Sequence, residues 1–254
     1  MQKRLTGTTA LVTGASSGIG EATALALATE GADVALAARR GDRLEALSKQ
    51  IATMGVRALV LEADITDERQ AREIVDKTVA QFGRLDTLVN NAGLMLLGPI
   101  PDADVSEWVR MIEINLVALM RTTHAALPHL LRAAEDGPRK VADLINVSSV
   151  AGRTARADAG AYNATKWGVN AFSEALRQEV TRKHVRVGIV EPGMTATELQ
   201  GHNRPEILQQ LRTNTPMEDP LQASDIADAI AYIVTRPRHV AINEMLIRPV
   251  EQVR

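Results

Sequence analysis

Apolar and polar positions alternate along the chain between two kinds of segment. Short apolar runs bounded by glycine or polar residues predict buried strands near 8–13, 33–38, 56–62, 86–90, 141–147, 185–190 and 242–247. Longer segments with apolar residues at helical spacing predict helices near 18–30, 42–53, 67–82, 104–133, 161–182 and 223–235. This alternation predicts an α/β fold, with a Rossmann-type, doubly wound parallel sheet of about seven strands and helices on both faces.

One segment interrupts the alternation. Residues 195–220 follow the sixth predicted strand and contain Pro205, Pro216 and Pro220. A connection of this length is typical of an active-site lid or a substrate loop. The rest of the chain has no repeat, low-complexity tract or linker, so we expect residues 1–254 to form a single domain.

Composition narrows the classes of function. The formal net charge of −2 and the absence of a long basic cluster give no reason to expect nucleic-acid binding. The chain has no cysteine, which excludes disulfides and thiol catalysis, and its histidines show no metal-binding spacing. No apolar run approaches the roughly 20 residues of a membrane span. We therefore expect a cytoplasmic protein that acts on a small molecule without a metal ion.

The most specific chemical pattern is a tyrosine followed four residues later by a lysine, with a serine thirteen residues before it. Tyr162 and Lys166 share one face of a predicted helix, because positions i and i+4 lie one above the other. Ser149 follows the apolar run 141–147, at a strand end where open α/β sheets bind ligands. A cation beside a phenol lowers its pKa from about 10, so Tyr162 is a candidate general acid or base. A chance pair on an amphipathic helix is the alternative.

A glycine-rich turn joins the first predicted strand to the first predicted helix. Its glycines allow the backbone to approach a pyrophosphate group closely, and the helix N-terminus adds the positive end of a dipole. A tight turn without a ligand is the alternative. The turn and the helix start supply the first candidate cofactor residues: Gly14, Ser16, Ser17, Gly18, Ile19 and Gly20.

The end of the second predicted strand indicates the form of the cofactor. Folds that bind NAD place an acidic residue here, but strand 33–38 ends in alanine and is followed by Arg39 and Arg40. A guanidinium grips the 2′-phosphate of NADP through paired hydrogen bonds. We therefore expect NADP(H) and assign its phosphate chiefly to Arg39. Arg40 either assists or faces water, and a solvated charge pair is the alternative for both.

Further motifs occur in order along the chain: Asn90-Asn91-Ala92-Gly93, Asn115 and Pro192-Gly193. With these, the chain resembles the short-chain dehydrogenase/reductase family over nearly its whole length. Arg39-Arg40, the segment 95–99 and the segment 242–249 look most like the branch that contains clavulaldehyde reductase and bacterial 3-hydroxy acid dehydrogenases.

The resemblance implies a catalytic set of Asn115, Ser149, Tyr162 and Lys166. The hydroxyls of Ser149 and Tyr162 would stabilise a carbonyl oxygen, and Tyr162 would transfer the proton. Lys166 would bind the nicotinamide ribose, and Asn115 would hold a water that links Lys166 to solvent. The alternative for Asn115 is a core amide satisfied by backbone groups.

The resemblance also implies cofactor contacts at the strand ends. Asp64 and the two threonines after the sixth strand are also candidate helix caps, and the two roles are compatible for Asp64. The implied contacts are Asp64, Ile65, Asn91, Ala92, Gly93, Pro192, Gly193, Thr195 and Thr197.

These roles imply an NADP-dependent carbonyl reductase or alcohol dehydrogenase. Apolar residues after the strand ends are candidate substrate contacts beside Ser149, with packing in the core as the alternative: Met95, Leu96, Met194 and Leu199. Charged side chains are further candidates, with solvation as the alternative: Arg153 and Arg156 for a substrate carboxylate, and His202. A non-catalytic nucleotide sensor and an epimerase or dehydratase remain rival functions on this fold.

Two predicted helices carry apolar residues on more than one face. Segment 104–134 and the helix with Tyr162 both exceed the single stripe that covers a sheet. Two such helices per subunit can pair across a two-fold axis. The family commonly adds a second two-fold contact through the last helix and strand. We therefore expect a homotetramer, with a dimer as the second possibility and a monomer with these residues beneath segment 195–220 as the alternative.

Overall fold

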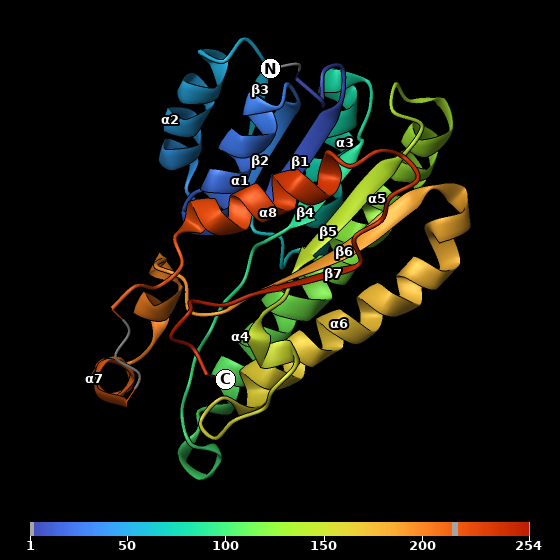
Figure 1. Ribbon diagram of the computed structural model, residues 1–254. Coiled ribbons are helices and arrows are strands. Elements are labelled where there is room, and N and C mark those ends of the chain that lie inside the picture. Colours follow the sequence, from blue (N-terminus) through green and yellow to red (C-terminus); the bar gives the residue numbers. More distant parts are fainter. Residues whose placement is uncertain (1–2, 215–217, 254) are drawn as a thin grey trace.

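The computed structural model describes residues 3–214 and 218–253, and its centre is one parallel sheet (Figure 1). Part of the predicted lid, with Pro216, lies outside the described residues. The seven strands lie in the order β3-β2-β1-β4-β5-β6-β7, and each neighbouring pair is parallel. They are β1 (Thr9–Thr13), β2 (Asp33–Ala38), β3 (Ala58–Glu62), β4 (Thr87–Asn90), β5 (Ala142–Val147), β6 (Val185–Pro192) and β7 (Glu244–Ile247). The predicted doubly wound α/β fold is confirmed.

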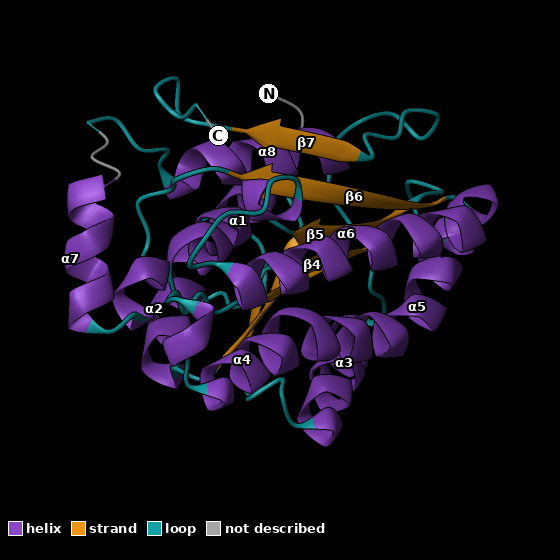
Figure 2. Ribbon diagram, turned by 90° about the horizontal axis from the view of Figure 1, so that it is seen from below, coloured by secondary structure: helices purple, strands orange, loops and turns teal. Residues whose placement is uncertain are grey.

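Helices cover both faces of the sheet (Figure 2). On one face lie α1 (Gly18–Thr29), α2 (Gly41–Ala52) and α8 (Ala223–Val234). On the other lie α3 (Glu68–Phe82), α5 (Ala118–Asp136) and α6 (Gly160–Val180), with α4 (Val105–Ile112) beside α6. Alternate residues of β1 enter the two cores, Leu11 on the α5 side and Val12 on the α1 side. Burial on both faces explains why the strands read as continuous apolar runs.

The predicted helix 104–133 consists of three parts. A π-helical segment, η2 (Glu113–Val117), separates α4 from α5 and contains Asn115. Such wide turns often mark functional sites. Short 3₁₀ turns complete the connections: η1 (Ile100–Asp102), η3 (Val150–Gly152), η4 (Thr181–Lys183) and η5 (Glu198–His202).

The segment after β6 contains a helix that the sequence pattern did not predict, α7 (Pro205–Asn214). Pro205 occupies its first position, where the missing N–H breaks no helical hydrogen bond. Figure 1 shows α7 standing away from the sheet, and Ile207 anchors it in a small core with Leu97 and Met111. Among the helices within the described ranges, none is long and apolar enough to cross a membrane.

A buried ion network joins β5, β6 and α8 near the start of the two strands. Arg186, 7% exposed, donates to both carboxylate oxygens of the fully buried Asp143 at 2.7 and 3.0 Å. Arg139 donates to the same carboxylate at 3.0 Å. Arg186 also donates to the Val234 carbonyl at the end of α8. The network thus ties the first residues of β5 and β6 to the end of α8.

We expect Asp143→Ala to lower the free energy of unfolding by about 3–5 kcal/mol, because Arg186 would stay buried without its carboxylate. Urea unfolding followed by circular dichroism, at fixed protein concentration, measures the change. Glu174→Ala is the control, since it removes an exposed pair with Arg177 on α6 and is expected to change little. Equal effects of the two substitutions would contradict the assigned role of the network.

Candidate active site

A cavity of about 810 Å³ opens at the carboxyl ends of the strands. Its walls are formed by the glycine-rich turn, the ends of β2 to β6, the start of α6, η5 and residues 251–253. Nearly all of the predicted cofactor residues line it: Gly14, Ser16, Ser17, Gly18, Ile19, Arg39, Arg40, Asp64, Ile65, Asn91, Ala92, Gly93, Tyr162, Lys166, Pro192, Gly193, Thr195 and Thr197. Gly20 lies beneath the turn, where a Cβ would come 2.3 Å from the Gly14 carbonyl oxygen.

The glycine-rich turn packs backbone against backbone. Gly14 and Gly18 have φ angles of 66° and 57°, in the left-handed region that favours glycine. A Cβ on Gly14 would lie 2.8 Å from the Cα of Ala92, and one on Gly18 would lie 3.1 Å from Thr197. Ser17, the N-cap of α1, makes no side-chain capping bond, so the first amides of the helix remain available to an anion. This donor set fits a pyrophosphate.

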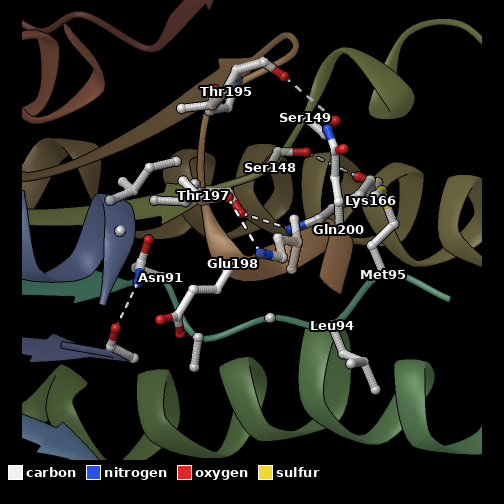
Figure 3. Close-up of a pocket in the computed structure, with 18 of the residues that line it drawn as sticks. Asn91, Leu94, Met95, Ser148, Ser149, Lys166, Thr195, Thr197, Glu198 and Gln200 are labelled. Carbon is white, nitrogen blue, oxygen red and sulfur yellow. Dashed lines mark hydrogen bonds between the residues drawn. The ribbon is translucent and has the colours of Figure 1, made fainter. Parts of the chain in front are cut away.

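Asn91 fixes the turn to the end of β4 (Figure 3). Its Nδ2 donates to the carbonyl oxygens of Thr13 and Gly14 at 3.0 and 3.3 Å. The backbone amides of Asn91 and Ala92 in turn donate to the Thr13 hydroxyl. The ends of β1 and β4 are therefore held as one rigid floor of the cavity.

The predicted tyrosine and lysine meet at the start of α6, where both side chains are buried. The Lys166 Nζ lies 5.8 Å from the centre of the Tyr162 ring and donates to the Val147 carbonyl at 2.9 Å. Ser149 lines the same cavity and caps η3, its hydroxyl accepting from the Ala151 amide at 3.1 Å. The ends of β5 and α6 thus place these three polar groups in one cavity.

Burial sets the protonation of both groups. It raises the pKa of Tyr162 above its ordinary 10.0, and the Ser149 hydroxyl and the Arg156 charge offset only part of that change. It also lowers the pKa of Lys166 to about 8. The sequence predicted a lowered pKa for Tyr162, and this direction is wrong because the loss of water around a phenolate outweighs the nearby charges. At neutral pH the phenol therefore keeps its proton.

Asn115 lies behind the cavity rather than in its wall. Its Oδ1 accepts from the Leu94 amide at 2.7 Å, and its Nδ2 donates to the Leu94 carbonyl at 2.8 Å. A Cβ on Gly93 would lie 3.3 Å from this Oδ1 and 4.0 Å from the Lys166 Nζ. The amide matches the alternative of a core residue satisfied by backbone, and the predicted water-holding role stays a prediction.

Arg40, rather than Arg39, is tied to the glycine-rich turn. Its Nε donates to the Ser16 hydroxyl at 3.1 Å, and its Nη2 donates to the Ser17 hydroxyl at 2.7 Å. Arg39 is exposed at the cavity rim, and no side-chain hydrogen bond of its guanidinium is found within residues 3–214 and 218–253. The structure thus distinguishes the two arginines, and the assignment of the phosphate chiefly to Arg39 stays a prediction.

Two charged residues that the sequence analysis missed stand beside Arg40. Glu198, in η5, accepts from Arg40 and from Arg43, each at 2.7 Å. Arg43 lies three residues after Arg40 at the start of α2. Residues three apart are neighbours on a helix surface, so this spacing could have indicated that the two arginines act together. Nothing in the sequence pattern indicated that Glu198 would meet them, because the contact spans 158 residues.

Asp64, Thr195 and Thr197 all line the cavity, but only Thr197 among the three caps a helix, because α3 has Asp67 as its N-cap. Asp64 accepts from the amide and hydroxyl of Thr66 at 3.0 and 2.7 Å. Thr197 caps η5 by accepting from the Leu199 amide. The Thr195 hydroxyl donates to the Gly193 carbonyl at 3.0 Å. These local bonds are compatible with the cofactor contacts that the resemblance implies.

Three of the four predicted apolar substrate contacts line the cavity: Met95, Met194 and Leu199. Leu96 does not, because it packs into the core against Met111.

Of the three charged substrate candidates, two line the cavity and one does not. Arg156 and His202 line the cavity. Arg153 instead donates to Glu191 at 2.7 Å and pairs with Glu244. These acidic partners occupy its guanidinium, so of the two substrate candidates Arg156 is the arginine that lines the cavity.

The end of the described chain also contributes to the cavity, which the sequence did not indicate. Glu251, Gln252 and Val253 line it. The Gln252 Oε1 accepts from the Met194 amide at 2.8 Å and so holds the loop after β6. These residues follow the last predicted strand without a periodic pattern, so no sequence signal placed them there.

Comparisons with known proteins point to one family. The family model described as short chain dehydrogenase matches residues 8–207. An uncharacterized oxidoreductase of Staphylococcus aureus is 36% identical over 97% of this chain and 99% of its own length. Glycine betaine reductase ATRR of Emericella nidulans is 37% identical over 96% of this chain, which spans 19% of that relative's length.

A solved structure agrees with these matches. The alcohol dehydrogenase of the archaeon Thermococcus sibiricus, complexed with 5-hydroxy-NADP, has a TM-score of 0.85 and 30% sequence identity. The alignment covers 96% of this chain and 97% of that one. The narrower resemblance to one branch stays a prediction. With the glycine-rich turn and the Tyr162–Lys166 pair inside the matched region, the chain belongs to the short-chain dehydrogenase/reductase family.

Proposed function

We propose that this protein is an NADP(H)-dependent oxidoreductase that interconverts a carbonyl compound and its alcohol. The observation that carries the proposal is the meeting of Ser149, Tyr162 and Lys166 with the glycine-rich turn in one cavity. The amides at the start of α1 suit a pyrophosphate, and the arginines after β2 suit a 2′-phosphate. The cofactor would supply or accept a hydride at the substrate carbon.

The protein's own groups would handle the charge and the proton. During reduction, negative charge develops on the carbonyl oxygen, and the hydroxyls of Ser149 and Tyr162 donate hydrogen bonds to it. Tyr162 then gives its proton, which burial keeps on the phenol at neutral pH. The Lys166 ammonium stabilises the phenolate that remains, and it acts more strongly because both groups are buried.

The substrate side of the cavity favours a medium-sized aldehyde or ketone. Met95, Met194 and Leu199 provide an apolar wall. Arg156 brings a positive charge close enough to influence Tyr162, so a substrate that carries a carboxylate is the preferred subclass. A panel of aldehydes, ketones and hydroxy acids, assayed with NADPH and NADH, tests the class.

We expect Tyr162→Phe to reduce turnover at least about a hundredfold with any active substrate, because the ring remains but the proton donor is lost. NADPH binding, measured by its fluorescence, should persist. A variant with near-full activity would remove Tyr162 from the mechanism.

The same assays separate the rival functions. A nucleotide sensor would bind NADPH without oxidising it in the presence of any carbonyl. An epimerase or dehydratase would turn over substrate with no net change in NADPH absorbance.

We expect the reduction rate at saturating substrate and cofactor to fall as pH rises above about 8. The pKa of Lys166 is lowered to about 8, so its ammonium is present below that pH and is lost above it. The phenolate formed at Tyr162 would then lack its neighbouring cation. A pH profile of kcat measures this effect, with NADPH affinity at each pH as the control. A rate that stays constant to about pH 10 would contradict the role of the ammonium.

We also propose a homotetramer, with a dimer as the second possibility. Val105, Val109 and Trp167 on the neighbouring helices α4 and α6 are each more than half exposed, and Tyr232 on α8 and Leu246 on β7 are also exposed apolar side chains. Apolar side chains gathered in this way are typical of protein interfaces.

Light scattering on a sizing column should give about four times the mass of one chain, and Trp167→Glu should give about half of that, because a closed tetramer of this kind has two kinds of two-fold contact. Lys77→Glu on α3, outside both surfaces, is the control. A wild-type mass near the 27.4 kDa of one chain would exclude both assemblies.

A further inference from the structure

The carboxylate of Glu198 connects the loop after β6 to the basic residues after β2. Its Oε2 lies 2.7 Å from Nη1 of Arg40, and its Oε1 lies 2.7 Å from Nη1 of Arg43. Figure 3 shows this carboxylate directed away from Ser149 and Lys166. One anionic group therefore bridges two guanidiniums at the edge of the cavity. The adenosine half of the dinucleotide would lie at this edge.

This bridge has the chemistry of an anion site. Nε and Nη2 of Arg40 donate to the hydroxyls of Ser16 and Ser17, which fixes its guanidinium on the glycine-rich turn. Hydrogen bonds from Arg43 and Arg40 lower the pKa of Glu198 to about 2, so the carboxylate is charged at any physiological pH. A second anion could take the donors that now point at Glu198 only if this carboxylate moved away.

A phosphate monoester is a suitable competitor for the same donors. It carries a charge of about −1.5 to −2 at pH 7 and three acceptor oxygens, whereas a carboxylate carries one charge and two oxygens. The three side chains of the bridge are between 41% and 50% exposed, so water screens the present ion pairs. A screened bridge of this kind is readily exchanged for a more highly charged ligand.

Displacement of Glu198 would also affect the substrate side. Glu198 is the first residue of η5, and Leu199, Gln200 and His202 from the same turn line the cavity. The ion pair between Glu198 and Arg43 ties the start of η5 to α2. Loss of the bridge would therefore free the start of η5 to adjust, while Asn203 still holds its end to Met95 and Leu97.

We propose that Glu198 is an internal competitor for the 2′-phosphate of the cofactor, which displaces it from Arg40 and Arg43 and releases η5. The inference rests on the proposed NADP(H) function. It makes Glu198 and Arg43 determinants of cofactor selectivity, and it couples the phosphate to the wall of the substrate pocket.

The binding test uses two ligands that lack the nicotinamide: adenosine 2′,5′-bisphosphate and adenosine 5′-monophosphate. Isothermal titration compares the wild type with Glu198→Gln. We expect the variant to bind the bisphosphate about 3- to 10-fold more tightly, because two screened ion pairs no longer compete, and to bind the monophosphate as the wild type does. Glu179→Gln, the same charge change on an exposed residue of α6, is the matched control and should change neither affinity.

Hydrogen exchange of the amides in residues 199–203 tests the release of η5. In the wild type, saturating bisphosphate should accelerate exchange there, and the monophosphate should not. In Glu198→Gln, exchange should be fast already and should not respond to the bisphosphate. Unchanged exchange in the wild type would overturn the coupling to the pocket wall.

The outcomes separate this inference from the proposed function. If the wild type prefers the bisphosphate but Glu198→Gln binds it no more tightly, the competition is wrong and the NADP assignment stands. If neither protein prefers the bisphosphate, the NADP assignment fails and the competition fails with it. An equal gain in Glu179→Gln would reduce the effect to net charge and overturn the role of Glu198.

Discussion

The close contact of backbone with backbone at the glycine-rich turn is the constraint on which the cavity depends. A side chain on Gly20 would collide with the Gly14 carbonyl oxygen, and one on Gly14 would collide with the backbone of Ala92. The hydrogen bonds from Asn91 can reach the turn only because these contacts are so short. The carboxyl ends of β1 and β4 therefore form one rigid surface, from which the amides of α1 and the segment 91–94 both face the cavity.

Burial then determines the chemistry of that surface. It raises the pKa of Tyr162 and lowers the pKa of Lys166 from 10.5 to about 8, so each charged form is disfavoured where it stands. For Lys166 the shift corresponds to about 3 kcal/mol of unfavourable free energy for the ammonium at neutral pH, a contribution that diminishes as pH rises from about 8 towards 10.5. Groups held at such a cost are typical of functional sites.

The sequence predicted the sheet, the site and most of its lining because these depend on local patterns. Strand periodicity, the three glycines and the i, i+4 spacing of Tyr162 and Lys166 are all readable over a few residues. The misses are contacts between distant segments. Glu198 meets Arg40 across 158 positions, and Gln252 reaches Met194 across 58. The sign of the Tyr162 pKa shift was also missed, because the extent of desolvation follows from tertiary packing rather than from spacing.

The charged residues around the cavity also divide into those held by contacts near in sequence and those held by contacts between distant segments. Arg40 and the two serines of the turn are hydrogen-bonded to one another within the first βαβ segment. The phosphates of a dinucleotide would bind beside them. Met194, Leu199 and Arg156, which line the proposed substrate side of the cavity, lie on the segments that follow β5 and β6. Glu198 lies in the segment after β6, but its ion pairs are with Arg40 and Arg43 after β2. With the proposed function, a carboxylate in that position would link recognition of the cofactor to the loop on the substrate side, which neither segment could do alone.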